Sequence, residues 1–143
     1  MSKRISVTEL RKYKSAGKKI AALTSYDFYT SRILDASGID MILVGDSLGM
    51  VFQGKTTTIP VTVEQMIYHT KIVVDSTTVP LVVADMPFGS FQTSYEKAVE
   101  NAVRIIKESG CNAVKLEGGK RVVPIVEHLT ASGIPVFGHL GLT

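Results

Sequence analysis

Five short apolar runs recur along the chain, and they limit the folds that it can adopt more than any other feature. Each run is almost continuously hydrophobic, without the alternation of apolar and polar residues that marks a strand with one wet face. Such runs are typical of strands that a parallel sheet buries on both faces. The sequence therefore predicts five strands of a parallel sheet, at Ile20–Leu23, Met41–Val44, Leu81–Ala84, Ala113–Leu116 and Pro135–Phe137.

Helical signals separate these runs. Thr62–Gln65 and Thr93–Glu96 both have the form of a capping box, in which a Thr side chain and a Glu or Gln three residues later bind free amide groups of the first turn. Apolar residues at helical spacing follow the second box, so this helix is expected to turn an apolar stripe toward the sheet. A further helix is predicted near residues 8–16. Strands and helices are thus expected to alternate from Ile20 onward.

A Ser-Gly pair precedes three of the apolar runs, within Ala36–Ile39, Glu108–Cys111 and Ala131–Ile134. A glycine after a helix ends it in the left-handed conformation and releases the chain into the next strand. The repetition indicates right-handed βαβ units, which either close into a (β/α)₈ barrel or lie open as a doubly wound sheet. A complete barrel takes about 250 residues. The 143 residues therefore suit an open flavodoxin-like sheet or the first part of a barrel.

The composition is that of one globular domain spanning residues 1–143, since 45% of the residues are hydrophobic and 20% are charged. This balance excludes disorder, collagen and coiled coils. The formal net charge is +3, and the basic residues are scattered apart from one cluster between Lys12 and Lys19. A single cluster of this kind is typical of a solvated helix face, so no nucleic-acid partner is expected.

Cys111 is the only cysteine, which excludes an internal disulfide and a Cys-x-x-Cys metal or redox site. The residues after Met1 lead into Thr8–Arg11 rather than into the apolar run of a signal peptide. No stretch reaches the roughly 18 apolar residues of a membrane span. We therefore expect a soluble cytoplasmic protein without a membrane partner.

Polar side chains follow the predicted strands at the points where these end. Asp46 and Ser47 follow the second strand, Asp85 the third, Glu117 the fourth, and His139 the fifth. Because active sites of parallel α/β proteins lie at the carboxyl ends of the strands, these side chains are expected to converge at one rim. The three carboxylates form a set of hard oxygen ligands that suits Mg²⁺. The alternative is that each acidic residue caps a helix or forms an ion pair in a loop.

Lys115 lies inside the fourth apolar run, where an unpaired ammonium group would be costly. It is expected to point along the strand toward Glu117 or toward an anionic ligand. A structural salt bridge is the alternative. His139 is either a donor to a ligand or a core histidine whose bonds are satisfied inside the protein.

Gly45–Gly49 matches the Gly-x-Ser-x-Gly pattern of a nucleophile elbow and contains the letters of the Gly-Asp-Ser-Leu esterases. This makes Ser47 a candidate nucleophile of a serine hydrolase. An elbow requires a helix directly after the serine, whereas Met50–Pro60 carries Gly, Thr and Pro residues that predict a strand or a loop. An esterase using Ser47 stays as an alternative function.

Six segments of the chain resemble the ketopantoate hydroxymethyltransferase family, also called the 3-methyl-2-oxobutanoate hydroxymethyltransferases. They occur in the family's order and spacing across residues 10–143, and they are Thr24–Asp27, Leu43–Met50, Pro60–Thr62, Ala84–Phe88, Val114–Gly119 and Gly138–Thr143. The resemblance implies a (β/α)₈ barrel of the phosphoenolpyruvate mutase and isocitrate lyase type, of which this chain holds about the first five strands. It also implies synthesis of ketopantoate for the pantothenate and coenzyme A pathway.

By the same resemblance, Mg²⁺ binds at Asp46, Asp85 and Glu117, directly or through water. The substrate, the 2-oxo acid 3-methyl-2-oxobutanoate, is expected to contact Asp46, Ser47, Asp85, Lys115 and His139. The implied reaction removes a proton beside the keto group, and the enolate, which Mg²⁺ stabilises, attacks the one-carbon unit of 5,10-methylenetetrahydrofolate. The family forms a homo-oligomer, a decamer, so the expected partners are these small molecules and further copies of the chain.

The family's catalytic base, a Glu, is expected beyond Thr143. The only acidic residue after Glu117 is Glu127, which falls within a predicted helix. The resemblance thus implies that these residues are the N-terminal part of the enzyme, without the base, and inactive alone. The other possibility is a non-catalytic fragment that binds ligand or pairs with another chain.

Overall fold

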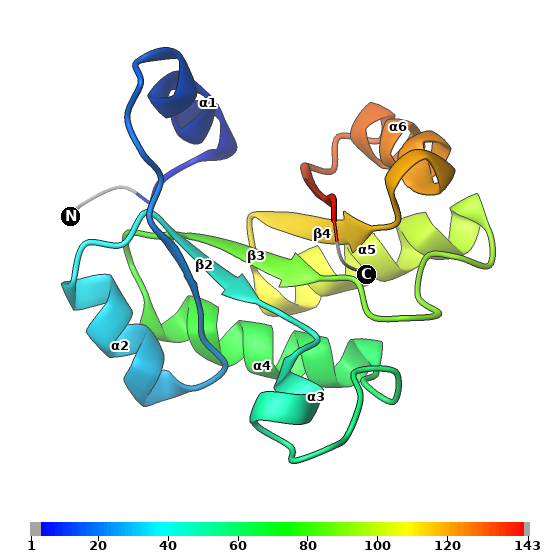
Figure 1. Ribbon diagram of the computed structural model, residues 1–143, viewed down its shortest axis with the longest axis horizontal. Coiled ribbons are helices and arrows are strands. Elements are labelled where there is room, and N and C mark those ends of the chain that lie inside the picture. The colour runs from blue at the N-terminus through cyan, green and yellow to red at the C-terminus, as the bar shows by residue number, and fades with distance from the viewer. Residues whose placement is uncertain (1–3, 142–143) are drawn as a thin grey trace.

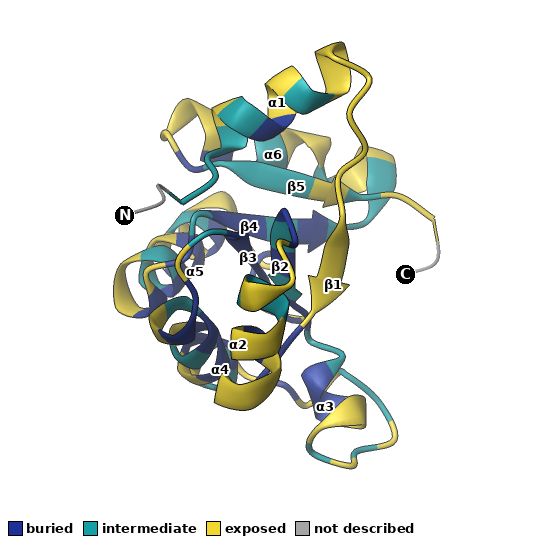
Figure 2. Ribbon diagram, turned by 90° about the vertical axis from the view of Figure 1, so that its left-hand side faces the viewer, coloured by how far each residue is buried: buried dark blue, intermediate teal, exposed yellow. Residues whose placement is uncertain are grey.

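A parallel sheet of five strands organises the molecule, and the strands follow one another across the sheet in sequence order (Figure 1, Figure 2). The computed structural model describes residues 4–141. A doubly wound sheet reverses its direction of growth, whereas a barrel adds every strand on the same side of the previous one. The order observed is therefore that of a barrel. The strands are β1 (Ala22–Thr24), β2 (Met41–Val44), β3 (Leu81–Asp85), β4 (Ala113–Glu117) and β5 (Val136–His139).

Helices connect the strands, and the two longest, α4 and α5, lie side by side along one face of the sheet (Figure 1). Among the helices of residues 4–141, none is both long and apolar enough to cross a membrane. The helices are α1 (Val7–Ser15), α2 (Phe28–Ala36), α3 (Leu48–Val51), α4 (Val63–Ser76), α5 (Tyr95–Ser109) and α6 (Val123–Ala131), with a 3₁₀ helix, η1 (Gly119–Val122), before the last.

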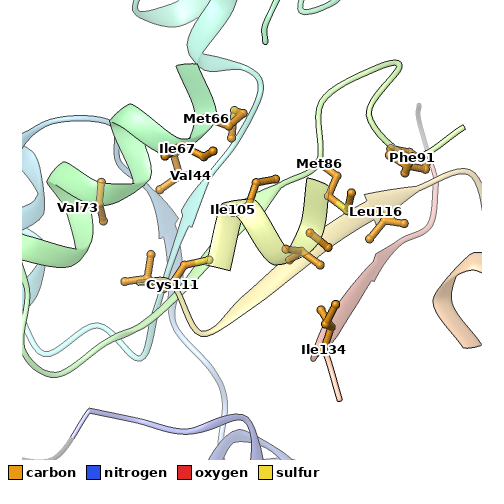
Figure 3. Packing of buried hydrophobic residues seen from close by; sticks show 14 of the residues in the cluster. Val44, Met66, Ile67, Val73, Met86, Phe91, Ile105, Cys111, Leu116 and Ile134 are labelled. Carbon is orange, nitrogen blue, oxygen red and sulfur yellow. The ribbon is translucent and has the colours of Figure 1, made fainter. Parts of the chain in front are cut away.

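The strand side chains divide between two cores, as the two-residue period of a strand requires. The larger core joins the sheet to its connecting helices, as Ile105 of α5 and Leu116 of β4 illustrate (Figure 3). On the opposite face, Leu10 of α1 packs against Leu81 and Ala113, the first residues of β3 and β4. Helix α1 therefore covers the amino end of this second face, and the carboxyl end remains available for a site.

The five predicted strands are confirmed, with changes at their ends. β2 has the predicted bounds, β3 and β4 are each one residue longer, β1 begins two residues later, and β5 extends to His139. The three predicted glycine helix ends are also confirmed, since φ is 76° at Gly38, 79° at Gly110 and 82° at Gly133.

One of the two predicted capping boxes is confirmed. The Thr62 amide donates to Gln65 Oε1 at 3.1 Å, and the Gln65 amide donates to Thr62 Oγ at 3.2 Å. The box at Thr93–Glu96 is wrong, because Ser94 holds the extended N-cap position and accepts from the Lys97 amide at 3.1 Å. Helix α5 therefore starts one residue later than the predicted box requires.

Strands β1 and β5 are the two edges of the sheet in the part of the chain that the structure describes. All three residues of β1 are exposed, and the Leu23 side chain is exposed to 57% (Figure 2). All buried residues of the five strands lie in the three inner strands. The sheet thus presents open edges on both sides.

Candidate active site at the carboxyl ends of the strands

Asp85 and Lys115 form an ion pair at the carboxyl ends of β3 and β4. They are partners in the register of the two strands, so their side chains leave the same face of the sheet. Only 7% of the Asp85 side chain and 18% of the Lys115 side chain is exposed. Two opposite charges are therefore held together in a shielded position on the face opposite the connecting helices.

Burial raises the pKa of Asp85 above its ordinary value, and the negative charge of Asp46 raises this pKa further. Lys115 and the Asp46 backbone amide act in the opposite direction and lower it. That amide donates to Asp85 Oδ2 at 3.1 Å. A carboxylate whose charge is disfavoured by burial and by a like charge is stabilised when a cation binds beside it.

Ser47 is held by Tyr26, whose hydroxyl oxygen lies 2.7 Å from Ser47 Oγ. Tyr26 follows β1 and is buried, and its carbonyl oxygen lies 2.8 Å from Nδ1 of His69 in α4. Gly45 leaves the space that the serine occupies, because a Cβ at this position would lie 2.7 Å from Ser47 Oγ and 3.3 Å from Asp85 Oδ2. The serine hydroxyl is therefore fixed in the neighbourhood of the Asp85 carboxylate.

Glu117 and His139 lie further along the same rim, and both are partly exposed. They are register partners on β4 and β5. Lys115 precedes Glu117 by two residues on β4, so the two side chains lie on the same face of the sheet. The predicted orientation of Lys115 toward Glu117 is wrong, because the register sets Lys115 opposite Asp85 instead. The alternative prediction, a salt bridge for Lys115, is the one observed. Leu142 and Thr143, at the end of the last resembling segment, lie outside the described residues.

The carboxylates at this rim fit Mg²⁺ by their chemistry, because carboxylate oxygens are its preferred protein ligands. Across residues 4–141, no three His, Cys, Asp or Glu side chains are placed so that they could hold a metal ion by themselves. Asp46 and Asp85 are in electrostatic contact, and Glu117 lies on the next strand. Mg²⁺ commonly takes one or two carboxylates and completes its shell with water and substrate oxygens. The residues present fit a metal held in that way.

A helix of four residues, α3, begins directly after Ser47, so the predicted strand or loop over Met50–Pro60 is wrong at Met50 and Val51, whereas residues 52–60 form a loop as predicted. Gly54 and Pro60 disrupt only the later part of the segment and leave room for one helical turn. Within residues 4–141, the hydroxyl partner of Ser47 is Tyr26, and no histidine is hydrogen-bonded to this serine. The general base that an esterase needs beside its nucleophile is therefore not found next to Ser47.

Tyr26 is the site residue to which the sequence pattern assigned no role. The signal for it is nevertheless present, because Ser25–Asp27 follows the first apolar run just as Asp46 and Ser47 follow the second. Its contact with Ser47 depends on how β1 and β2 pair, and this pairing is not encoded in either segment alone.

The sequence model of the ketopantoate hydroxymethyltransferase family matches residues 4–143. The chain is 57% identical, over all 143 residues, to a 3-methyl-2-oxobutanoate hydroxymethyltransferase from Thermoanaerobacter sp. (strain X514), and it covers 52% of that relative. It is 54% identical over 140 residues to the enzyme of the same name from Moorella thermoacetica, covering 98% of this chain and 52% of the relative. The chain thus spans about half the length of the curated relatives that it matches.

Solved structures give the fold independently. The chain superposes on 2,3-dimethylmalate lyase, a PEP mutase/isocitrate lyase superfamily member, with a TM-score of 0.66 and 14% identity, over 92% of this chain and 51% of the lyase. Oxaloacetate acetylhydrolase in complex with oxalate gives a TM-score of 0.64 and 12% identity, over 90% of this chain and 50% of the hydrolase. The five strands therefore have the fold of part of a (β/α)₈ barrel of the kind found in these enzymes, as predicted. Sequence and fold agree, and the chain belongs to the ketopantoate hydroxymethyltransferase family.

Proposed function

We propose that this chain carries the metal- and substrate-binding part of an enzyme that transfers a hydroxymethyl group from 5,10-methylenetetrahydrofolate to 3-methyl-2-oxobutanoate. The product is ketopantoate, an intermediate of pantothenate biosynthesis. The observation that carries the proposal is the buried Asp85 carboxylate, which meets the Lys115 ammonium and the Asp46 amide. A buried carboxylate between a cation and a second carboxylate is an arrangement suited to binding a divalent ion and an anionic substrate together.

The reaction requires stabilisation of negative charge, because loss of the proton at C3 of the 2-oxo acid produces an enolate. When bound, Mg²⁺ supplies a Lewis acid for this charge; Asp46, Asp85 and Glu117 would hold it. Lys115, kept in place by Asp85, provides a positive charge beside the substrate. These residues stabilise the enolate, with its additional negative charge, more than the 2-oxo acid from which it forms.

Ser47 and His139 orient the 2-oxo acid. Ser47 donates a hydrogen bond to a substrate oxygen, and Tyr26 fixes the direction of its hydroxyl. His139, at the end of β5, contacts the substrate from the other side of the rim. Asp46 and Asp85 complete the contacts to the substrate from β2 and β3.

The proton at C3 passes to a glutamate outside this chain. Glu127, the one acidic residue after Glu117, is exposed on α6 and lies away from the strand ends. The enolate carbon then bonds to the methylene carbon of the donor, water supplies the hydroxyl oxygen, and tetrahydrofolate leaves. Two bonds form at the methylene carbon, one to the enolate carbon and one to the water oxygen, and its two bonds to the donor's nitrogens break. The proton from C3 and one proton from water end on these two nitrogens.

The enzyme is further proposed to act in the cytoplasm as a homo-oligomer. Support comes from the apolar surface of α2, where Tyr29 is 79% and Ile33 is 70% exposed. Exposed apolar groups that lie together on one surface are characteristic of contacts with further protein.

The test uses a completed enzyme, defined here as this chain followed by the part of the Thermoanaerobacter relative that lies beyond its match. Ketopantoate formation from both substrates is expected, with loss of activity on chelation of the metal and return of activity with Mg²⁺. Ser47→Ala should reduce this activity, while Ser37→Ala, at the exposed end of α2, should not.

The outcome that contradicts the proposal is an enzyme that forms no ketopantoate and instead hydrolyses p-nitrophenyl esters in a Ser47-dependent manner. That result would favour the esterase. Absence of both activities would favour a non-catalytic role for this chain, in which it binds ligand or pairs with another chain.

A further inference from the structure

A cavity of about 390 Å³ adjoins the proposed site between the loops that follow β3 and β4. Glu117 and Gly118 form its end at the rim, and Phe88, Phe91 and Arg121 form its walls. This volume is within the range of about 300–1,000 Å³ that small-molecule sites occupy. The cavity is therefore large enough for part of a second substrate beside the first.

The cavity continues away from the rim. A second hollow of about 450 Å³ shares Phe91, Gln92 and Arg121 with it and extends to residues 93–96, at the start of α5. We call these two adjoining hollows together the β3–β4 groove; Glu117 lines the first of them, and residues 93–96 line the second. Phe91 lies beside Leu116 at the end of the buried core, so the hydrophobic core supplies one wall of this groove (Figure 3).

The side chains of this groove have a definite ligand chemistry. Phe88 is 62% exposed although it is aromatic, and Phe91 is buried behind it. Arg121 is exposed, and no ion pair involves it within residues 4–141. An exposed aromatic ring and an unpaired guanidinium in one concave surface suit an elongated ligand with a flat ring and a carboxylate.

We propose that the β3–β4 groove binds the aminobenzoyl-glutamate arm of the one-carbon donor, with Phe88 against its ring and Arg121 on a carboxylate. The inference rests on the proposed function, which supplies a donor of this shape. With its arm in the groove, the donor's methylene carbon lies toward Glu117 and the 2-oxo acid. The two substrates then meet at the rim from neighbouring loops.

The experiment measures two reactions of the completed enzyme. Ketopantoate formation depends on 5,10-methylenetetrahydrofolate, whereas deuterium exchange at C3 of 3-methyl-2-oxobutanoate in D₂O requires enolate formation only. Arg121→Ala should raise the KM for the donor by about tenfold or more, since it removes a charge-assisted hydrogen bond. Deuterium exchange and the KM for the 2-oxo acid should stay at wild-type values.

Lys120→Ala is the matched control, because Lys120 is an exposed cation next to Arg121 that does not line the groove. It should leave the KM for the donor unchanged, and Arg121→Lys should restore part of the lost affinity. An unchanged donor KM in Arg121→Ala, or equal losses in exchange and in product formation, would overturn the assignment of the groove. A wild-type completed enzyme without exchange and without product would instead contradict the proposed function itself.

Discussion

Lys115 and Asp85 stabilise each other in a mostly buried position, where either charge would be unfavourable without the other. Burial raises the pKa of Asp85 in the folded protein. The contribution of this carboxyl group to the free energy of unfolding is therefore fully present below its pKa in the unfolded chain, and it is lost as the pH rises through its pKa in the folded protein. Lys115 opposes this loss by favouring the ionised carboxylate. The pair therefore matters most where Asp85 is ionised.

Lys115→Met is predicted to destabilise the completed enzyme by about 3 kcal/mol at pH 8, because it leaves a buried carboxylate without its counter-charge. The deficit should shrink toward pH 5, as Asp85, with its pKa raised further, becomes protonated. Denaturant unfolding at both pH values measures this. Lys97→Met, which breaks an exposed pair with Glu100, should cost less than about 1 kcal/mol at either pH. A Lys115→Met deficit that does not change with pH would contradict the account.

Gly45→Ala is predicted to weaken binding of 3-methyl-2-oxobutanoate by about tenfold, through the serine that it displaces. The added Cβ would lie 2.7 Å from Ser47 Oγ, so the hydroxyl would have to leave its place beside Tyr26. Loss of one oriented hydrogen bond to a charged group has about this effect. Calorimetry on Gly45→Ala, Ser47→Ala and the double variant checks the route, since effects that act through one residue are not additive. Additive losses would show that Gly45 acts by another route.

At the scale of elements, glycine ends and strands are predictable because their signals are local. The apolar runs and the Ser-Gly pairs report directly on burial and on helix termination, and they recover all five strands and the ends at Gly38, Gly110 and Gly133. The observed N-cap of α5 is Ser94, one residue after the predicted Thr93. Both residues are good N-caps, and the choice between them depends on the geometry of the preceding loop.

The site could be predicted only in part, because some of its features are local in the sequence and others depend on how the strands pair. Residues at strand ends are readable from the sequence, so Asp46, Ser47, Asp85 and Glu117 could all be assigned to one rim. The partner of Lys115 could not, because the register between β3 and β4 is set by packing of both strands on α4 and α5.

Gly110→Ala is predicted to destabilise α5 and the strand that follows by about 1–2 kcal/mol, because its φ of 79° is unfavourable for a residue with a Cβ. Val74 Cγ1 would also lie 3.4 Å from the new methyl group. Denaturant unfolding of the completed enzyme provides the measurement. Lys107→Ala, in the last turn of the same helix, serves as the control and should change stability by less than about 0.5 kcal/mol. Equal effects of the two changes would argue against the role given to Gly110.

On the scale of the whole molecule, the chain has the strand order of a barrel and about half the length of its curated relatives. Its β1 edge is exposed along its entire length, and β5 is only partly covered. Unpaired strand edges and exposed apolar side chains tend to bind other protein chains.

The 143-residue chain expressed alone is therefore predicted to self-associate and to form no detectable ketopantoate. Lack of a general base alone lowers a rate by about 10²–10⁴. Light scattering and a ketopantoate assay, with the completed enzyme as the positive control, measure both properties. A monodisperse, cooperatively melting chain that turns over both substrates would refute the placement of the base outside it.

The central claim, that Asp85 and its neighbours form a site for a divalent cation and a 2-oxo acid together, is tested most directly by calorimetry. The completed enzyme is titrated with 3-methyl-2-oxobutanoate with and without Mg²⁺, as wild type, Asp46→Asn, Asp85→Asn and the control Asp75→Asn, whose carboxylate is an exposed partner of Lys71. The account predicts that Mg²⁺ strengthens binding in the wild type and in the control. It predicts that Asp46→Asn and Asp85→Asn each lose at least about tenfold of this affinity. Wild-type affinity under Mg²⁺ in both variants would contradict the account.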